Sequence, residues 1–98
     1  MEKTFTIKQV LPIHDRQYQD QQGQSRVFTS LGVVLTDGID TIFAEATGDY
    51  ARSLVGQLNE GDMVRAQLSM SVRDWTDQQG QARYENRAYV STIKKIKD

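Results

Sequence analysis

Residues 63–93 read MVRAQLSMSVRDWTDQQGQARYENRAYVSTI, and this stretch decides the fold. From Met63 to Arg73 the residues alternate between apolar and polar. A period of two predicts a half-buried β-strand. The residues expected to face inward are Val64, Ala66, Leu68, Met70 and Val72. A polar loop at Thr76–Gln81 follows, and Arg83–Ile93 is predicted to return as the last strand.

The first part of the chain predicts two further strands around a polar segment. Lys3–Ile13 is rich in apolar residues, and its alternation breaks near Gln9, which indicates a strand with a β-bulge. His14–Gln24 is polar and has no periodicity, so we expect a flexible loop there. Ser25–Thr36 alternates cleanly and predicts a strand, with Gly32 at a position where a barrel strand can bend.

A hairpin and a short helix are predicted between these two regions. Asp37-Gly38 readily takes the positive φ angles of a tight turn, so Asp40–Thr47 is expected to pair with the preceding strand. In Asp49–Leu58 the apolar spacing changes to about four residues, which indicates an amphipathic helix. The turn residues Asn59–Asp62 end it.

The order of these elements is three strands, one short helix and two strands. This order predicts an all-β fold, a five-stranded OB-fold Greek-key barrel whose helix lies between the third and fourth strands. An SH3-like barrel and an open α+β sheet are the alternatives. The 98 residues are enough for a single domain over residues 1–98 and leave no room for a second core.

The composition excludes several classes of protein. Hydrophobic residues make up 38% and charged residues 26%, as in an ordinary globular protein. With no cysteine and His14 as the one histidine, we expect no metal and no cofactor. No catalytic motif is present, so the chain is not predicted to be an enzyme. The N-terminal residues lack the pattern of a signal peptide and no apolar run is long enough to span a bilayer, so we expect a cytoplasmic protein without membrane attachment.

Charge is distributed unevenly along the chain. The net charge is −1, but residues 1–62 carry five basic and nine acidic side chains, whereas residues 63–97 carry seven basic and three acidic ones. Any surface that binds phosphate is therefore expected to draw on the C-terminal third.

The last two strands also combine cations with aromatic rings, as a surface for single-stranded nucleic acid requires. The candidate binding residues there are Arg65, Arg73, Trp75, Arg83, Arg87 and Tyr89. Tyr18 joins them as an aromatic residue in a long polar loop. Trp75 has a second interpretation, in which it closes the end of the barrel or lies in a subunit interface. For Tyr84 core packing is favoured, and Phe5, Phe28 and Phe43 are expected in the core or an interface.

Residues 59–96, NEGDMVRAQLSMSVRDWTDQQGQARYENRAYVSTIKKI, resemble bacterial single-stranded DNA-binding proteins. In that family a strand ends in Arg, one further residue and Trp, and Asp-x-x-Gly-Gln-x-Arg-Tyr follows. Gly48–Leu58 can be matched to the family's helix without a gap, so the resemblance covers about half of the chain. It implies base stacking by Trp75 and phosphate contacts by Arg73 and Arg83.

The sequence also departs from that family. Two of the family's stacking positions fall on Thr41 and Thr47, which have no ring. The chain ends in Lys94–Asp98 without the family's acidic tail, so we expect no recruitment of enzymes through such a tail.

The resemblance implies a non-enzymatic protein that binds single-stranded DNA, or RNA, with little sequence preference. It would be an accessory protein in DNA replication, repair or mobile-element transfer and would form a homodimer or homotetramer. The alternative is an OB-fold protein-interaction module that does not bind nucleic acid.

Overall fold

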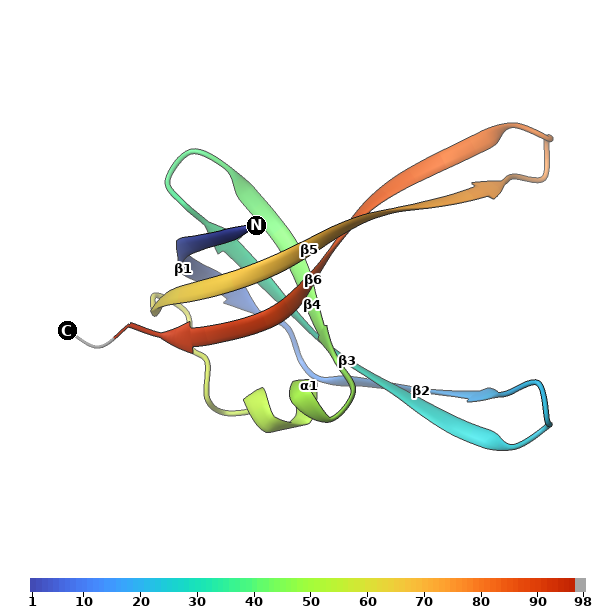
Figure 1. The fold of residues 1–98 in the computed structure, drawn as a ribbon, viewed down its shortest axis with the longest axis horizontal. Helices are drawn as coiled ribbons and strands as arrows, with labels where there is room; N and C mark the ends of the chain where they lie inside the picture. Colours follow the sequence, from blue (N-terminus) through green and yellow to red (C-terminus); the bar gives the residue numbers. More distant parts are fainter. Residues whose placement is uncertain (97–98) are drawn as a thin grey trace.

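A computed structural model describes residues 1–96 and shows a small β-barrel with two projecting hairpins (Figure 1). Its elements are β1 (Glu2–Val10), β2 (His14–Gln19), β3 (Ser25–Thr36), β4 (Thr41–Thr47), α1 (Gly48–Leu54), β5 (Met63–Thr76) and β6 (Ala82–Lys95). Lys97, which contributes to the positive charge of the C-terminal third, and Asp98, the last residue of the expected tailless end, lie outside the described residues.

The six strands form one sheet in the order β1-β5-β6-β4-β3-β2, and an additional pairing of β1 with β3 closes it. The pairings are antiparallel except for β4 with β6. The β1–β3 register shifts between Ile7 and Gln9, so the predicted bulge is confirmed. It lets β1 bend and pair with β3 on one edge and β5 on the other. The predicted OB-fold is confirmed, with α1 between β4 and β5.

The core fills the barrel and follows the predicted alternation. Phe5, Leu35 and Val64 are almost fully buried. From α1, Ala51 and Leu54 join the core. The Tyr50 hydroxyl accepts a hydrogen bond from the Ile93 amide at 2.8 Å, which fixes the helix to β6.

The helix is shorter than predicted. It ends at Leu54 instead of Leu58. Gly56 has a φ of 77°, in the left-handed region, and such a glycine ends a helix. Leu58 is nevertheless buried, because the turn that follows carries it back against the core.

The predicted loop over His14–Gln24 is wrong in most of its length. Residues 14–19 form β2, which pairs with β3 from Ser25 to Ser30. Every β2 residue is exposed, because the β2–β3 hairpin extends beyond the barrel. A strand with no buried face shows no alternation in its sequence.

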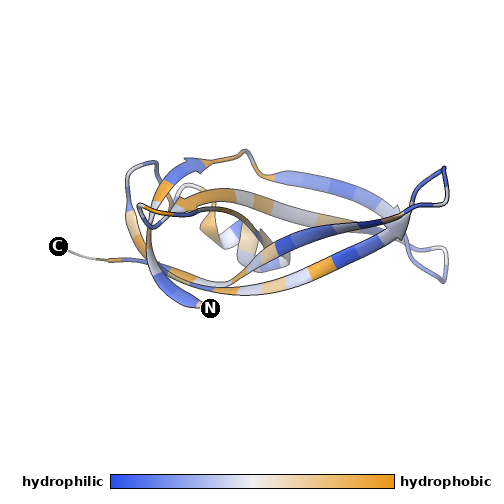
Figure 2. Cartoon of the chain, turned by 90° about the horizontal axis from the view of Figure 1, so that it is seen from above, coloured by the Kyte–Doolittle hydropathy of each residue, from blue (hydrophilic) through white to orange (hydrophobic). Residues whose placement is uncertain are grey.

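The β5–β6 hairpin also extends beyond the barrel, and it projects from the same end of the molecule as β2–β3 (Figure 1). Both ribbons become hydrophilic toward their tips (Figure 2). Met70 and Val72, predicted to face inward, are therefore exposed. They keep the inward side of β5, but beyond Leu68 no core lies beneath that side.

Candidate nucleic-acid interface

The β5–β6 hairpin presents Trp75 next to two arginines. Trp75 pairs across the hairpin with Arg83. The Arg73 guanidinium lies 5.0 Å from the centroid of the indole, a cation–π contact. Since Trp75 is 40% exposed, its ring is available to a ligand while Arg73 restrains it.

Arg83 is held by the tip of this hairpin. Its Nε donates to Asp77 Oδ2 at 2.9 Å, and the amides of Gln79 and Gln81 donate to Oδ1. The Gln81 amide, followed by the Arg83 guanidinium, lowers the pKa of Asp77. Through these contacts the Asp77 carboxylate holds the strand end that carries Arg83, opposite Trp75.

Glu85 joins the other two arginines of the hairpin. Its Oε2 lies 3.8 Å from Arg73 Nη1 and 3.5 Å from Arg87 Nη2. Tyr89, and secondarily Glu85, raise the pKa of Arg87. Two cations thus lie on one face of the hairpin around a single carboxylate.

The burial of the two tyrosines of β6 could not be predicted from the alternation of the sequence alone. Tyr84 was expected in the core, but it is 72% exposed, since it lies on the part of β6 beyond the barrel. Tyr89 is half-buried and pairs with Ser69 of β5 and Glu45 of β4. Neither belongs to the core cluster.

Arg65 lies apart from these residues. It is eight positions before Arg73 on β5, about 26 Å along a strand. Its guanidinium donates to Thr4 Oγ1 at 3.2 Å and lies 3.7 Å from Glu2. The structure therefore places Arg65 beside β1 and not in the hairpin.

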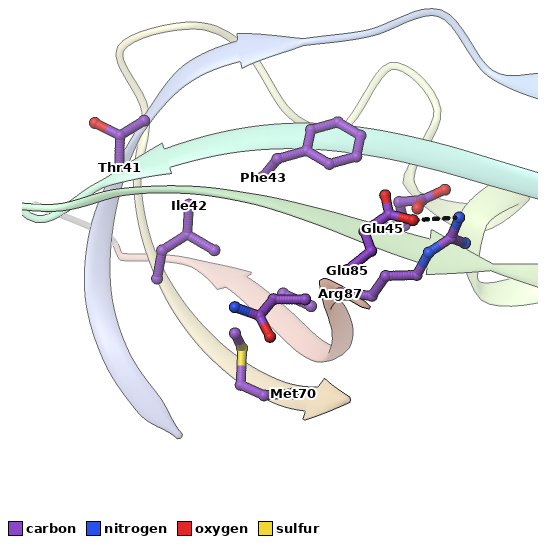
Figure 3. Close-up of a pocket in the computed structure, with 9 residues that line it drawn as sticks. Thr41, Ile42, Phe43, Glu45, Met70, Glu85 and Arg87 are labelled. Carbon is purple, nitrogen blue, oxygen red and sulfur yellow. Dashed lines mark hydrogen bonds and ion pairs between the residues drawn. The ribbon is translucent and has the colours of Figure 1, made fainter. Parts of the chain in front are cut away.

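Two adjoining hollows lie between the roots of the two hairpins. The larger, of about 310 Å³, has Phe43, Met70 and Ala88 among its lining residues (Figure 3). The second is lined by His14, Arg16, Phe28, Ser30, Glu45 and Arg87. Glu45 and Arg87 line both hollows. The two hollows therefore form one continuous surface, which we call the groove.

Phe43 and Phe28 supply aromatic surface in the groove. Both were expected in the core or an interface, together with Phe5. Phe5 is in the core, but Phe43 is 50% and Phe28 40% exposed in this chain. The Phe43 ring covers Gly32, where no side chain separates it from the strand. Arg16 lies 5.9 Å from the centroid of Phe28.

The signal for these rings was present in the sequence. Phe28 and Phe43 occupy the outward side of the alternation on β3 and β4, where a large apolar residue has no core to enter. Thr41, one of the two positions that lack an expected ring, lines the groove beside Phe43. Thr47, the other, is half-buried and pairs with Ser30.

Tyr18 lies on the other hairpin. It pairs with Arg26 across β2 and β3 and is 46% exposed. Arg26 Nε donates to Asp20 Oδ2 at 3.0 Å. Apart from Arg65, the candidate residues are thus divided between the β2–β3 and β5–β6 hairpins, whose places are seen in Figure 1. Residues of both hairpins line the groove.

Within residues 1–96, no group of three or more His, Asp or Glu side chains is arranged to hold a metal ion. Over the same residues, no helix has the length and hydropathy needed to cross a bilayer.

Comparisons with known proteins place the fold. No protein-family model and no curated protein matches the sequence. Among solved structures, the chain is similar to Rim1, the mitochondrial single-stranded DNA-binding protein of S. cerevisiae. The TM-score is 0.57 at 10% identity, over 100% of this chain and 94% of that one. It is also similar to the small single-stranded DNA-binding protein of Streptomyces coelicolor. Here the TM-score is 0.50 at 23% identity, over 98% of this chain and 92% of that one. The chain therefore has the OB-fold of these single-stranded DNA-binding proteins along essentially its whole length.

Proposed function

We propose that this protein binds single-stranded DNA with little sequence preference and catalyses no reaction. The observation that carries the proposal is the groove, where the exposed rings of Phe28 and Phe43 lie beside Arg16 and Arg87. Rings stack on any base and cations meet the phosphates, so such a surface reads no sequence. The similarity in fold to two single-stranded DNA-binding proteins supports it.

The Arg73–Trp75 segment extends this surface along the β5–β6 hairpin. Arginine and ring are already in contact in the free protein, so little side-chain order has to be gained on binding. The Glu85 carboxylate lies between Arg73 and Arg87 and competes with phosphate for them. We therefore expect moderate affinity, in keeping with the net charge of −1.

Because Trp75 is the one tryptophan, its fluorescence reports on the site directly. We expect oligo-dT to quench it at low salt and duplex DNA to quench it much less. Trp75→Ala should weaken binding in a gel shift by about fivefold to a hundredfold, the effect of one lost stacking interaction. Absence of both quenching and a gel shift at micromolar protein would contradict the proposal.

The same titration with oligo-U compares RNA with DNA. Stacking surfaces accept both, and equal affinities would widen the substrate class to single-stranded nucleic acid. We also propose a homodimer or homotetramer, which light scattering on the purified protein tests. If Trp75→Ala changes that mass and the wild type binds no DNA, the chain is a protein-interaction module.

A further inference from the structure

The two projecting hairpins carry similar sequences. Residues 16–26 read RQYQDQQGQSR and residues 73–83 read RDWTDQQGQAR. Seven of the eleven positions are identical, and an aromatic residue occupies the third position of both. We call these segments the first and the second repeat.

The repeats also share their geometry. In the first, Asp20 Oδ1 accepts the amides of Gln22 and Gln24, both at 2.9 Å, and Asp20 Oδ2 accepts from Arg26 Nε at 3.0 Å. Asp77 makes the matching three contacts in the second, each at 2.9 Å. Gly23 and Gly80 have φ angles of 78° and 81°.

The aromatic residues occupy equivalent places on this frame. Tyr18 pairs with Arg26, and Trp75 pairs with Arg83. The two rings are similarly exposed, at 46% and 40%. Two residues before each ring is an arginine in contact with an aromatic face: Arg16 over Phe28, and Arg73 over Trp75.

Turn formation explains only part of the repetition. The aspartate, the glycine and the last arginine build the tip in both hairpins. The first arginine and the aromatic residue take no part in the tip contacts, yet they recur at the same positions and on the same face. What is repeated is therefore an exposed ring two residues after an arginine, and each arginine lies over an aromatic face, Phe28 in the first hairpin and Trp75 in the second. Exposed rings beside cations are the chemistry that binds single-stranded nucleic acid.

We propose that the two repeats are copies of one binding element, so that Tyr18 is a second base-stacking site equivalent to Trp75. The groove connects them, because its hollows are lined by Arg16 on one side and by Glu85 and Arg87 on the other. This inference rests on the proposed function. It makes the ligand a single strand long enough to contact both hairpins at once.

Two attachment points on one strand give a length dependence. A strand of about 4 nucleotides, at the short end of what OB domains cover, reaches one repeat, whereas one of about 16 reaches both. Once one end is bound, the other repeat binds at high effective concentration. Affinity should therefore rise with oligonucleotide length more steeply than expected from the larger number of positions at which a longer strand can be bound.

The first test compares Tyr18→Ala, Trp75→Ala and Tyr84→Ala. Each of the first two should weaken binding to the long oligo-dT by about fivefold to a hundredfold, and Tyr18→Phe should keep wild-type affinity because the ring remains. Tyr84 is a matched control, an exposed tyrosine of the β5–β6 hairpin that lies on the opposite face from Trp75. Its removal should leave affinity unchanged.

The second test places the fluorophore in the first repeat. In the variant Tyr18→Trp with Trp75→Phe, the long oligo-dT should quench the introduced indole. If it does not, although the same sample shows a gel shift, the first repeat does not stack on the strand and the inference is wrong.

The inference and the proposed function fail differently. Wild-type affinity of Tyr18→Ala together with weak binding by Trp75→Ala overturns the second stacking site and leaves single-stranded DNA binding intact. No binding by the wild-type protein overturns both. Circular dichroism melts of each variant show whether a loss of affinity is a loss of fold.

Discussion

The Phe43 ring lies against the backbone of Gly32, so closely that a Cβ at position 32 would fall 2.7 Å from its Cε2 atom. Gly32→Ala should therefore displace the ring from the groove. Because Phe43 is half exposed, the ring can move outward at little cost in stability. We expect affinity for oligo-dT to fall by about fivefold or more, with a nearly unchanged melting temperature. In Phe43→Ala, adding Gly32→Ala should have no further effect on affinity, and additive losses would contradict the mechanism.

Removing the charge of Glu85 should strengthen binding. Its carboxylate lies within 4 Å of both Arg73 and Arg87, so a phosphate must compete with it. Exposed ion pairs of this kind contribute up to about 1 kcal/mol, so Glu85→Gln should tighten binding by about twofold to fivefold. Glu60→Gln removes one charge from the connection between α1 and β5 and serves as the control. Equal gains in the two variants would mean that net charge alone acts.

The two arginines that flank Trp75 should differ in their response to salt. Arg73 lies over the ring, whereas Arg83 is hydrogen-bonded to Asp77. If Arg73 contacts a phosphate, Arg73→Gln should reduce the slope of log affinity against log salt by about 0.7. Arg83→Gln should lower affinity by loosening the tip and leave that slope unchanged. Equal slope changes would show that Arg83 also contacts phosphate.

Acid should destabilise the protein through the turn aspartates. The amides of Asp40 and Ile39, together with Lys3, lower the pKa of Asp37 from 3.8 to about 2. A lowered pKa in the folded state contributes stability that is complete above about pH 4 and is lost as the pH falls toward 2. The pKa values of Asp20, Asp62 and Asp77 shift in the same direction.

The melting temperature should therefore vary little with these groups between pH 5 and 8 and fall between pH 4 and 2. Asp37→Asn should have a lower melting temperature than the wild type at neutral pH, and its melting temperature should fall less on acidification. Calorimetry can measure both. If the melting temperature of Asp37→Asn falls with pH as steeply as that of the wild type, Asp37 does not contribute to the acid sensitivity.

The sequence was sufficient for the barrel because burial leaves a pattern. Leu31, Val33 and Leu35 alternate on β3, and the break near Gln9 marked the bulge of β1. The pattern could not show where the barrel ends. Met70 continues the alternation of Leu68 although the core stops between them.

The parts of the site that were missed are those without a core beneath them. β2 is stabilised by pairing with β3 and by the contacts of the Asp20 tip, and neither produces periodicity in the sequence. The alternation placed Phe28 and Phe43 on the outward side of their strands, but nothing in it showed that this side lines a groove between two hairpins.

The parallel pairing of β4 with β6, through Ala44 with Ala88 and Glu45 with Tyr89, joins the two halves of the barrel at the floor of the groove. A DNA strand bound there would span the two halves of the chain at this junction. Opening of the junction and release of DNA would then be thermodynamically linked, because DNA that binds only the closed junction stabilises it against opening. Occupancy of the groove would then be measurable as slower hydrogen exchange of the amides that join β4 to β6.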